Sequence, residues 1–474
     1  MLQGLQFKSI KALENLKRIS LILFVFLALA RTSPASEGPG EAKVLTFETF
    51  CRKAVAYYPK LKQQDASVNA AIAKKLLAVS GFLPRVQGVT SVTHGDDPVF
   101  VFGSLLRENS FTSDNFELSK LNTPSPHTTY NFSLEAQWPI FDAFQTISRV
   151  RSAKFMIDSA RFDKAFTQME AYLVSSEAYL RAEALEKLLA SVSEVSLDSQ
   201  EDIKQAEDLK EKGLILGADF YSAKVILGNI NQLKNQLTRE KQAAHILLNI
   251  LMGEDPFNAF EIQSEPVRGQ AGNKTLESWL EEAYKLRPDF VAMDKTILAQ
   301  QAEVSRERST ALPRVDAFME ARDDTHNFRS NGGRNYIAGV KAQIDLFDPA
   351  YPERVRISRE ALKKLELEKV LLKDNITKDL ANEFAYYMSA LDNLPLFQKM
   401  LEDAKQAVDL MLPLYREGRK SIADLLQIRF SYLNSAKGYY TLATDSRSSW
   451  MRLLFLSGQL DEARMNAVLK SKEE

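Results

Sequence analysis

Apolar and polar residues alternate without interruption between residues 130 and 138, which is the pattern of a β-strand with one apolar and one polar face. The apolar face carries Tyr130, Phe132, Leu134, Ala136 and Trp138. Aromatic residues stand at both ends of this face, and a strand of about ten residues with such ends suits a membrane-crossing strand as well as an ordinary one. Whether these five side chains face lipid therefore depends on the rest of the chain.

The same alternation returns at residues 336–346, and each of the two segments ends in Phe-Asp and leads into the longest helical pattern of its half. Pro84 and Pro313, each in a Leu-Pro-Arg-Val run, are separated by as many residues as Pro59 and Pro288. A spacing repeated over such a distance indicates a duplicated chain rather than a short solenoid repeat. We therefore expect two similar structural repeats.

Each repeat shows the order helix, strand, strand, long helix, shorter helix. Equivalent positions of the two repeats are separated by fewer residues after the second strand than before the first strand. The first repeat therefore carries an insertion, which lies between residues 86 and 130. This insertion is the longest tract without a helical pattern, and we expect an external loop there. The predicted helices are 46–81, 143–212, 218–252, 276–311, 353–417 and 422–457, and the predicted strands are 85–94, 130–138, 314–322 and 336–346.

The long helices set the architecture. A helix at residues 143–212 would be about 105 Å long at 1.5 Å per residue, far more than one compact core can cover. The other two helices of each repeat are about half as long, so one long helix can lie antiparallel to two shorter ones placed end to end. Apolar residues between residues 372 and 415 recur every three, four or seven positions, as coiled-coil packing requires. We expect a mainly α fold of long antiparallel coiled-coil helices with a small β part.

The N-terminus has the features of a secretory signal peptide. Basic residues precede an apolar run at residues 19–30, and small residues follow it up to Ala35. A transmembrane anchor is less favoured, because this run is shorter than the roughly 20 residues that cross a bilayer. We therefore predict a signal peptide at 1–35, a first structural repeat at 36–263 and a second at 264–474.

Composition and candidate chemistry argue against an enzyme. The chain is 45% hydrophobic and 26% charged, as in ordinary globular proteins, and its net charge of -1 does not favour nucleic-acid binding. The single cysteine, Cys51, excludes an internal disulfide and is expected to be buried on the first helix. No His or Cys pair has metal-ligand spacing, and there is no G-x-S-x-G motif. We predict no catalytic residue, metal or cofactor; the four separate histidines are His94, His127, His245 and His326.

Several loose motifs occur in a specific order along the chain. They are Leu-Arg-Pro-Asp at 286–289, the strand ends Trp-Pro-Ile-Phe-Asp at 138–142 and Ile-Asp-Leu-Phe-Asp-Pro at 344–349, and Tyr-Arg-Glu-Gly-Arg-Lys-Ser-Ile-Ala-Asp-Leu-Leu at 415–426. Together with the signal peptide and the duplicated element order, they make the chain resemble the outer membrane efflux proteins, the TolC family, over essentially all of its mature length.

The resemblance implies a homotrimer in the outer membrane of a Gram-negative bacterium. Four strands per chain would contribute to one trimeric transmembrane β-barrel, and the helices would form an α-barrel that extends into the periplasm. Four strands cannot close a barrel alone, and an open strand edge is not stable in lipid, which independently favours several chains around one axis. The implied function is a passive exit duct for small molecules or ions, with an inner-membrane pump and a periplasmic adaptor (membrane fusion) protein as partners.

The resemblance also implies a gate at the periplasmic tip of the helices. The family carries a carboxylate where Gln427 stands, which leaves one carboxylate per chain at the ring. An alternative is that Asp219 and Asp424 are first-turn acids favoured by the helix dipole. The matching gate positions are Asp219, Tyr415, Lys420, Asp424 and Gln427, and the tip residues implied to contact the adaptor are Gly213, Leu214, Gly418 and Arg419.

Two other functions remain open at this point. One is the outer-membrane component of a type I protein secretion system, which belongs to the same class. The other, from a different class, is a non-channel periplasmic coiled-coil scaffold or adaptor. The sequence does not choose among drug, metal-ion, solvent and protein export, because the substrate is selected by other components.

Overall fold

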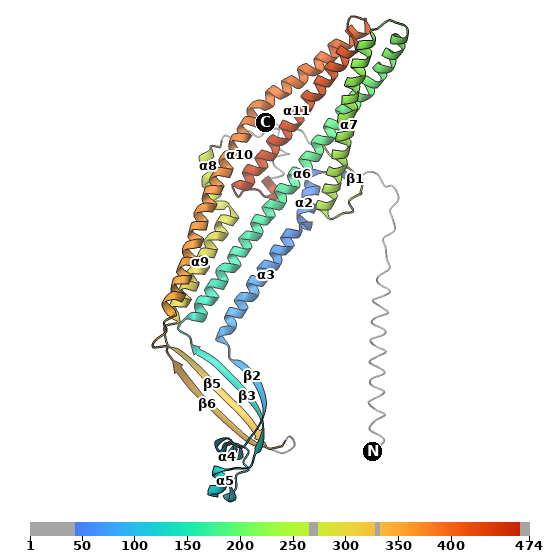
Figure 1. Ribbon diagram of the computed structural model, residues 1–474. Helices are drawn as coiled ribbons and strands as arrows, with labels where there is room; N and C mark the ends of the chain where they lie inside the picture. The colour runs from blue at the N-terminus through green and yellow to red at the C-terminus, as the bar shows by residue number, and fades with distance from the viewer. Residues whose placement is uncertain (1–42, 265–273, 328–331, 465–474) are drawn as a thin grey trace, which may run out of the picture. The chain divides into compact units, whose positions relative to one another are not determined.

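The computed structural model describes residues 43–264, 274–327 and 332–464 (Figure 1). The predicted signal peptide lies outside these residues. Contacts divide the chain into two units. In the smaller unit, β1 (Lys43–Leu45) pairs with β4 (Phe260–Ile262). The other helices and strands belong to the larger unit.

Two helices of nearly equal length dominate the larger unit: α6 (Gln145–Glu211) and α10 (Tyr351–Arg416). They have 67 and 66 residues, so each is about 100 Å long at 1.5 Å per residue. The chain turns back after each into a shorter helix, α7 (Gly217–Met252) or α11 (Ile422–Leu456), which packs along it as an antiparallel hairpin (Figure 1). The predicted long antiparallel helices are confirmed in both halves.

Glycines end both long helices. Gly213 and Gly418 have φ of 72° and 71°, the left-handed conformation that glycine adopts without steric cost. The Leu214 amide then donates to the Leu209 carbonyl at 2.9 Å, and the Arg419 amide closes the second turn in the same way. These bonds satisfy carbonyls that the helix end leaves free, so each hairpin has a defined turn.

The first predicted helix of each repeat is in fact two helices. Pro59 and Pro288 begin the second helix of each pair, because proline lacks an N–H and its ring clashes with the carbonyl one turn earlier. The residues before them, Tyr58 and Arg287, have ψ of 110° and 118°, outside the helical range. The prediction of continuous helices at 46–81 and 276–311 is therefore wrong. The helices are α2 (Phe47–Tyr57), α3 (Pro59–Val79), α8 (Leu276–Leu286) and α9 (Pro288–Ser309), with the 3-10 turn η1 (Ser80–Phe82) after α3.

Apart from the insertion between the two strands of the first repeat, the order of elements is the same in both halves, so the duplicated helix-strand-strand-helix-helix pattern is confirmed. The division of the repeats at residues 263 and 264 stays a prediction. Cys51 is fully buried in α2, as expected, and this burial raises the pKa of its thiol.

The core lies where the two hairpins pack on each other. α11 contacts both α6 and α7, and buried apolar residues from these helices form two clusters. Burial of one large aliphatic side chain contributes roughly 1.5–3 kcal/mol, so the clusters hold the hairpins together. One cluster is Leu188, Val192, Val195, Ile230, Leu237, Leu433 and Ala436, and the other, nearer the hairpin turns, is Ile203, Ala206, Phe220, Ala223, Ile422, Leu425 and Leu426.

A four-stranded antiparallel sheet lies at the end of the helices opposite the hairpin turns (Figure 1). Its order is β2 (Arg85–Gly95), β3 (His127–Phe141), β5 (Arg314–Thr325) and β6 (Gly333–Gln343). These strands agree with the four predicted from alternation. The hairpins β2–β3 and β5–β6 come from different repeats and pair through β3 and β5.

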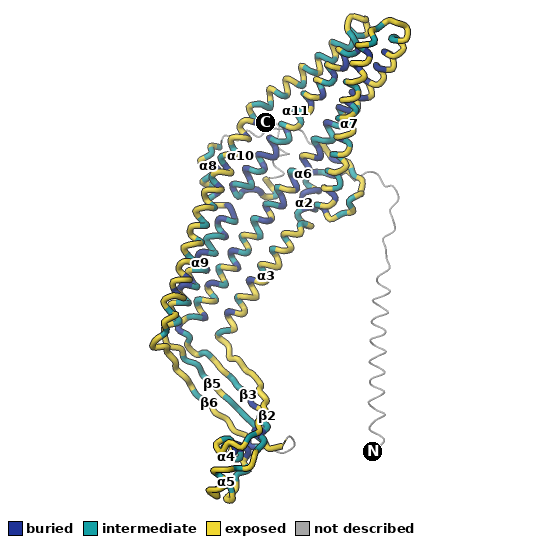
Figure 2. The backbone as a smooth tube through the Cα atoms, viewed as in Figure 1, coloured by how far each residue is buried: buried dark blue, intermediate teal, exposed yellow. Residues whose placement is uncertain are grey.

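The sheet is poorly covered by the rest of the chain (Figure 2). The edge strands β2 and β6 are exposed at almost every residue, on both faces. A free edge presents unpaired N–H and C=O groups that normally find a partner strand. No helix within the described ranges is both long enough and apolar enough to cross a membrane.

The insertion in the first repeat is not the non-helical loop that the sequence predicts. It contains α4 (Pro98–Arg107), the 3-10 turn η2 (Ser113–Phe116) and α5 (Leu118–Asn122). The Asp97 side chain accepts a hydrogen bond from the Phe100 amide at 2.7 Å, and proline occupies the first turn of α4. Both are helix-start signals, which explains why a helix forms in this tract.

Candidate functional site

The five residues predicted to face lipid share one face of β3, because side chains alternate along a strand. Phe132, Leu134 and Trp138 are 54%, 49% and 49% exposed, whereas Tyr130 and Ala136 are partly buried. The register continues this apolar face over the other three strands. It carries Val86, Val92, Met319, Ala321, Tyr336, Ala338 and Val340, and at its end farthest from the helices also the ion pair of Asp323 with Arg334.

The opposite face of the sheet is polar. Gln87 donates to the Glu135 carboxylate at 2.8 Å, and Asn131 donates to Asp324 at 2.9 Å. These bonds run between neighbouring strands and hold the polar side chains in place. The sheet therefore has one apolar and one hydrogen-bonded polar face, and the further charged residues of the polar face are Asp316, Glu320, Arg322 and Lys341.

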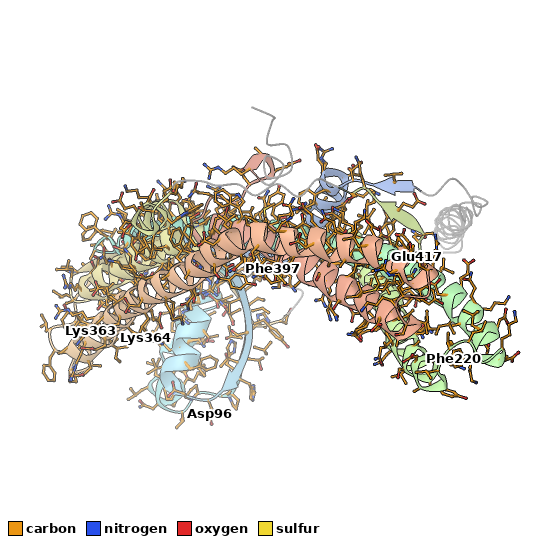
Figure 3. All side chains as sticks on the ribbon, turned by 90° about the horizontal axis from the view of Figure 1, so that it is seen from above. Asp96, Phe220, Lys363, Lys364, Phe397 and Glu417 are labelled. Atoms are coloured by element: carbon orange, nitrogen blue, oxygen red, sulfur yellow. The ribbon has the colours of Figure 1, made fainter. Side chains whose placement is uncertain are left out.

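The predicted gate residues lie near the two hairpin turns, at the same end of the helices. Figure 3 labels two residues at this end, Glu417 just after α10 and Phe220 in α7. Asp219 is half-buried in the first turn of α7, and Lys420 is exposed. Within the described chain, neither side chain takes part in an ion pair, so a link between them stays a prediction.

Asp424 begins α11 in a capping box. Its carboxylate accepts from the Ser421 amide at 3.2 Å, while its own amide donates to the Ser421 hydroxyl at 3.1 Å. This geometry gives Asp424 a role in starting the helix, which is the alternative raised from the sequence. Its side chain is nevertheless exposed, as is that of Gln427.

The four predicted adaptor-contacting residues are exposed at the hairpin turns. Leu214 is 68% exposed, an unusual position for a large apolar side chain. Arg419 lies 3.3 Å from Glu417 in an exposed ion pair. Gly213 and Gly418 shape the turns through their positive φ. The turns thus offer one apolar and one charged tip.

Sequence reasoning missed the strongest polar link near this end. Arg429 of α11 is buried, and its guanidinium lies 2.6 Å from Asp202 and 3.3 Å from the Ser199 hydroxyl of α6. Burial raises the pKa of the Asp202 carboxyl, and the charge of Arg429 opposes that rise. Tyr415 packs nearby, where burial and the charge of Asp202 raise the pKa of its phenol. Arg429 therefore connects the two hairpins through a desolvated ion pair.

The sequence does contain a signal for this link. Arg429 stands in the apolar stripe of α11, between Leu426 and Leu433 at the three- and four-residue spacings of a helix face. A charged residue at such a position is buried and needs a partner. The partner itself is far away in sequence, so only the fold identifies Asp202.

A second buried ion pair joins the same two helices. The Arg447 guanidinium of α11 lies 3.0 Å from Glu183 of α6, and the side chains are 6% and 3% exposed. Lys187 also approaches Glu183, at 2.7 Å. Buried pairs of this kind contribute more to the register of the helices than to net stability, because desolvation offsets the attraction.

The described residues contain no group of three or more His, Cys, Asp or Glu side chains that could hold a metal ion. The histidines lie apart: His245 contacts Glu186 at 2.8 Å in the helices, His94 contacts Thr128 in the sheet, and His127 contacts Glu108. His127 is thus held in place by the Glu108 carboxylate.

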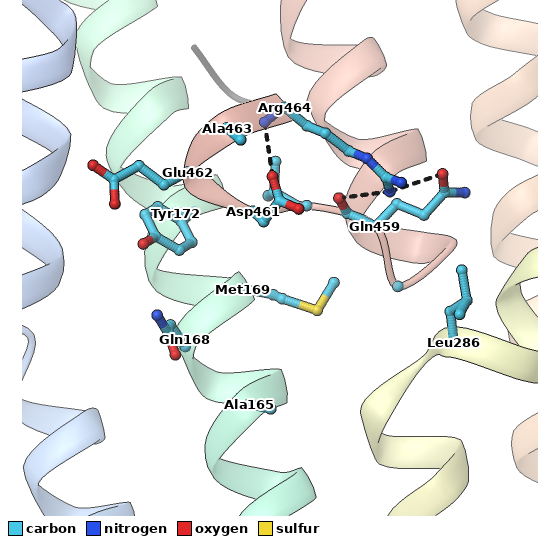
Figure 4. Close-up of a pocket in the computed structure, with 12 residues that line it drawn as sticks. Ala165, Gln168, Met169, Tyr172, Leu286, Gln459, Asp461, Glu462, Ala463 and Arg464 are labelled. Atoms are coloured by element: carbon cyan, nitrogen blue, oxygen red, sulfur yellow. Dashed lines mark hydrogen bonds between the residues drawn. The ribbon is translucent and has the colours of Figure 1, made fainter. Parts of the chain in front are cut away.

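One cavity, of about 610 Å³, lies between α6 and the segment that follows α11 (Figure 4). Arg464 donates to the backbone and side-chain oxygens of Gln459 at 3.1 and 2.9 Å, and its amide donates to Asp461 at 2.7 Å. These bonds fold the segment on itself and hold the charged side chains of the cavity wall in place.

Comparison with known proteins agrees with this geometry. No curated protein matches the chain in sequence. Solved structures of similar fold include a membrane protein from Pseudomonas aeruginosa (TM-score 0.74, 13% identity, covering 87% of this chain and 92% of that chain). The CmeC outer membrane channel of Campylobacter jejuni is similar as well (TM-score 0.72, 13% identity, 90% of each chain). So is the open state of the MtrE outer membrane channel of Neisseria gonorrhoeae (TM-score 0.69, 12% identity, 88% and 90%).

At these identities the structural matches show a shared fold, which covers both repeats. Residues 279–459, most of the second repeat, match the profile of the outer membrane efflux protein family. Residues 279–459 are thus similar to the outer membrane efflux protein family, and the chain shares its fold with solved outer membrane channels.

Proposed function

We propose that three copies of this chain form an outer-membrane exit duct through which small molecules or ions leave passively. The observation that carries the proposal is the sheet, which has an apolar face, a polar face and two unpaired edges. In a closed barrel of several chains, the edges of neighbouring copies pair, the apolar face meets lipid and the polar face lines the lumen. Tyr130 and Trp138, at opposite ends of the apolar face, would be anchors at the lipid headgroups.

The helices support assembly by the same reasoning. Large apolar side chains stay exposed on them, including Leu76 and Leu77 of α3 at 65% and 73%, and Leu371 and Leu410 of α10 at 62% and 72%. Burial of these side chains against a neighbouring copy would be favourable, because it removes apolar surface from water. Neighbouring copies that surround one axis would cover them and continue the lumen as an α-barrel into the periplasm.

The duct needs partners for energy and substrate selection. We infer that Leu214 and Arg419, with the glycines of their turns, contact a periplasmic adaptor, which couples the duct to an inner-membrane pump. The exposed positions of these residues at the free ends of the hairpins support this role. The proposed partners are therefore a homotrimer, the adaptor and pump, and outer-membrane lipid, without nucleic acid, cofactor or enzymatic activity.

The hairpin ends would act as a gate. The MtrE structure similar to this chain is described as an open state, so a channel of this fold has distinct states. In our proposal Asp219, Tyr415, Lys420 and Asp424 narrow the lumen at the tip, with Gln427 near the ring of carboxylates. The buried Arg429–Asp202 pair supports this by fixing one hairpin against the other.

Assembly and conduction test the proposal together. Purified protein in detergent should be a trimer by native mass spectrometry and should form discrete pores in planar bilayers. Cell fractionation should find it in detergent-extracted outer membrane. A soluble periplasmic monomer or dimer without pore activity would instead indicate a coiled-coil scaffold or adaptor.

A further inference from the structure

The insertion between β2 and β3 forms a small folded body at the end of the sheet farthest from the helices (Figure 1). In the second repeat the corresponding connection between β5 and β6 consists only of residues 326–332. The insertion therefore distinguishes one hairpin of the sheet from the other. Its position raises the question of which face of the sheet it covers.

The anchor of the insertion is Glu108, at the end of α4. Its side chain is 1% exposed. The carboxylate accepts a hydrogen bond from the Thr129 hydroxyl at 3.0 Å and lies 3.0 Å from Nε2 of His127. His127 and Thr129 are two residues apart on β3 and share the face of Glu135, which is the polar face. A buried carboxylate without partners is costly, so this contact favours one position of α4.

Two contacts with other strands agree with this placement. Asn335 of β6 donates to the Arg107 carbonyl at 3.0 Å, and Phe100 packs over Gly95 of β2. At Gly333 of β6, a Cβ atom would overlap the Arg107 carbonyl oxygen, so only glycine allows α4 to lie so close. The register places Gly95, Gly333 and Asn335 on the polar face as well. α4 thus crosses the polar face, with Phe100 near its start at β2 and Arg107 at its end at β6.

The insertion also has its own packing. Phe111 stacks edge-on against Phe102 and Phe116, with ring centroids 5.0 Å apart in each case. Ser104 and Val101 of α4 are buried. Aromatic pairs of this geometry stabilise beyond their buried area. The insertion is therefore a folded element with a fixed position on the sheet rather than a loop that projects into solvent.

We propose that α4, η2 and α5 form a lid over the outer mouth of the channel, which limits the entry of bulky solutes from outside. This inference rests on the proposed function, because it requires the polar face to line a lumen. Three copies of the lid around the axis would each extend over that lumen. The hydrogen bonds of Glu108 hold the lid closed. Gly333 permits this position, because it has no Cβ atom to displace α4.

A cysteine accessibility experiment tests the lid. In a Cys51→Ala background, Glu135→Cys reports on the lumen and its neighbour Leu134→Cys reports on the lipid-facing side. Intact cells are treated from outside with a membrane-impermeant poly(ethylene glycol) maleimide. Each reporter is measured in the full chain and in a variant whose residues 96–126 are replaced by a copy of residues 326–332.

We expect the maleimide to react slowly with Glu135→Cys in the full chain and roughly tenfold or more faster in the chain without the lid. If the mouth is open for about a tenth of the time or less, the labelling rate falls to that fraction of its value in an open channel. Gly333→Ala should act in the same direction, because its Cβ displaces α4. Gly88→Ala is the matched control, because its Cβ would meet Leu134 at an ordinary 3.9 Å. If the shortened chain does not assemble, Gly333→Ala still carries the test.

Fast and equal labelling of Glu135→Cys with and without the lid, together with no effect of Gly333→Ala, would overturn the lid. Failure of the proposed function gives a different result. A periplasmic scaffold would leave both Glu135→Cys and Leu134→Cys unlabelled in intact cells in every variant, because the reagent does not cross the outer membrane, and both would react after the cells are lysed.

Discussion

The Arg429–Asp202 pair offers the sharpest test of how the hairpins are held together. The two side chains are 5% and 13% exposed, and they lie 2.6 Å apart. Asp202→Asn leaves the guanidinium buried without its counter-charge. Removal of one partner of a buried ion pair costs about 3–5 kcal/mol, because a charge remains uncompensated. Ser199 and the more distant Asp198, at 3.9 Å, still contact Arg429, so we expect about 3 kcal/mol, the lower end of that range.

The double variant should behave differently from either single one. When Asp202→Leu is combined with Arg429→Met, both charges are gone and apolar side chains of similar length fill the space. Such replacements are neutral or stabilising, so the double variant should recover most of the loss. The difference between the summed effects of Asp202→Leu alone and Arg429→Met alone and the effect of this double variant measures the coupling of the two residues. Lys437→Met, an exposed cation on the same helix, is the matched control and should change stability by less than about 0.5 kcal/mol.

The Arg429→Met variant adds a pH dependence with a definite sign. Burial raises the pKa of Asp202, and without Arg429 only the smaller effect of the Arg416 charge opposes that rise. A carboxyl with a raised pKa binds its proton more tightly in the folded state, so the destabilisation is present above the raised pKa and is relieved as pH falls through it. Relative to the natural chain, the variant should therefore gain stability when the pH is lowered from neutral to mildly acidic.

The assay is thermal unfolding of the purified trimer in detergent, followed by circular dichroism at neutral and at mildly acidic pH. Asp202→Asn should lower the Tm by a few degrees. An unchanged Tm in both single variants would refute the reasoning. The hairpins would then be held by the apolar cluster alone, and Arg429 would be a tolerated rather than a structural charge.

Three further predictions follow from the surfaces. Leu134→Arg should destabilise the assembled protein by roughly 2–4 kcal/mol, because it places a charge in the lipid midplane, whereas Glu135→Arg should be tolerated; equal costs in urea unfolding of the reconstituted protein would argue for a soluble sheet. Lys420→Ser with Tyr415→Phe should raise single-channel conductance without changing trimer stability, since single exposed links contribute only about 0–1 kcal/mol but act together at the tip. Unaltered conductance in this double variant would mean that side-chain packing, and not these polar links, closes the tip. Asp424→Asn should weaken block by multivalent cations in the same bilayer recordings, and an unchanged block would place the cation site elsewhere.

Much of the architecture was predictable because it depends on short-range periodicity. The alternation around Leu134 and Tyr336 locates two strands, since residues two apart share a strand face whatever the tertiary context. Helical patterns as long as α6 and α10 have few competing structures, and Gly213 and Gly418 mark their ends through a conformation that glycine favours. The matching spacing of two Leu-Pro-Arg-Val runs shows the duplication.

Local chemistry was missed where two signals compete. Pro59 and Pro288 break the first helix of each repeat, although the apolar pattern continues through them, because a missing N–H and a ring clash outweigh periodicity. In the insertion, aromatic and proline residues indicated a loop, while Asp97 and Pro98 provide a helix start that outweighs them.

Contacts between residues far apart in sequence were decided by the tertiary structure alone. The sequence shows that Arg429 is a charge in an apolar stripe, but its partner Asp202 lies in the other repeat, and the pairing depends on how the two hairpins pack. The packing of α4 on the polar face likewise depends on Gly333. A side chain is excluded at this position only because the Arg107 carbonyl lies against it in the folded chain. Periodicity is a property of neighbouring residues, whereas burial and close approach are properties of the folded chain. The sequence by itself therefore determined the strands, the long helices and their duplication, and the tertiary structure decided which charges are buried and which face the insertion covers.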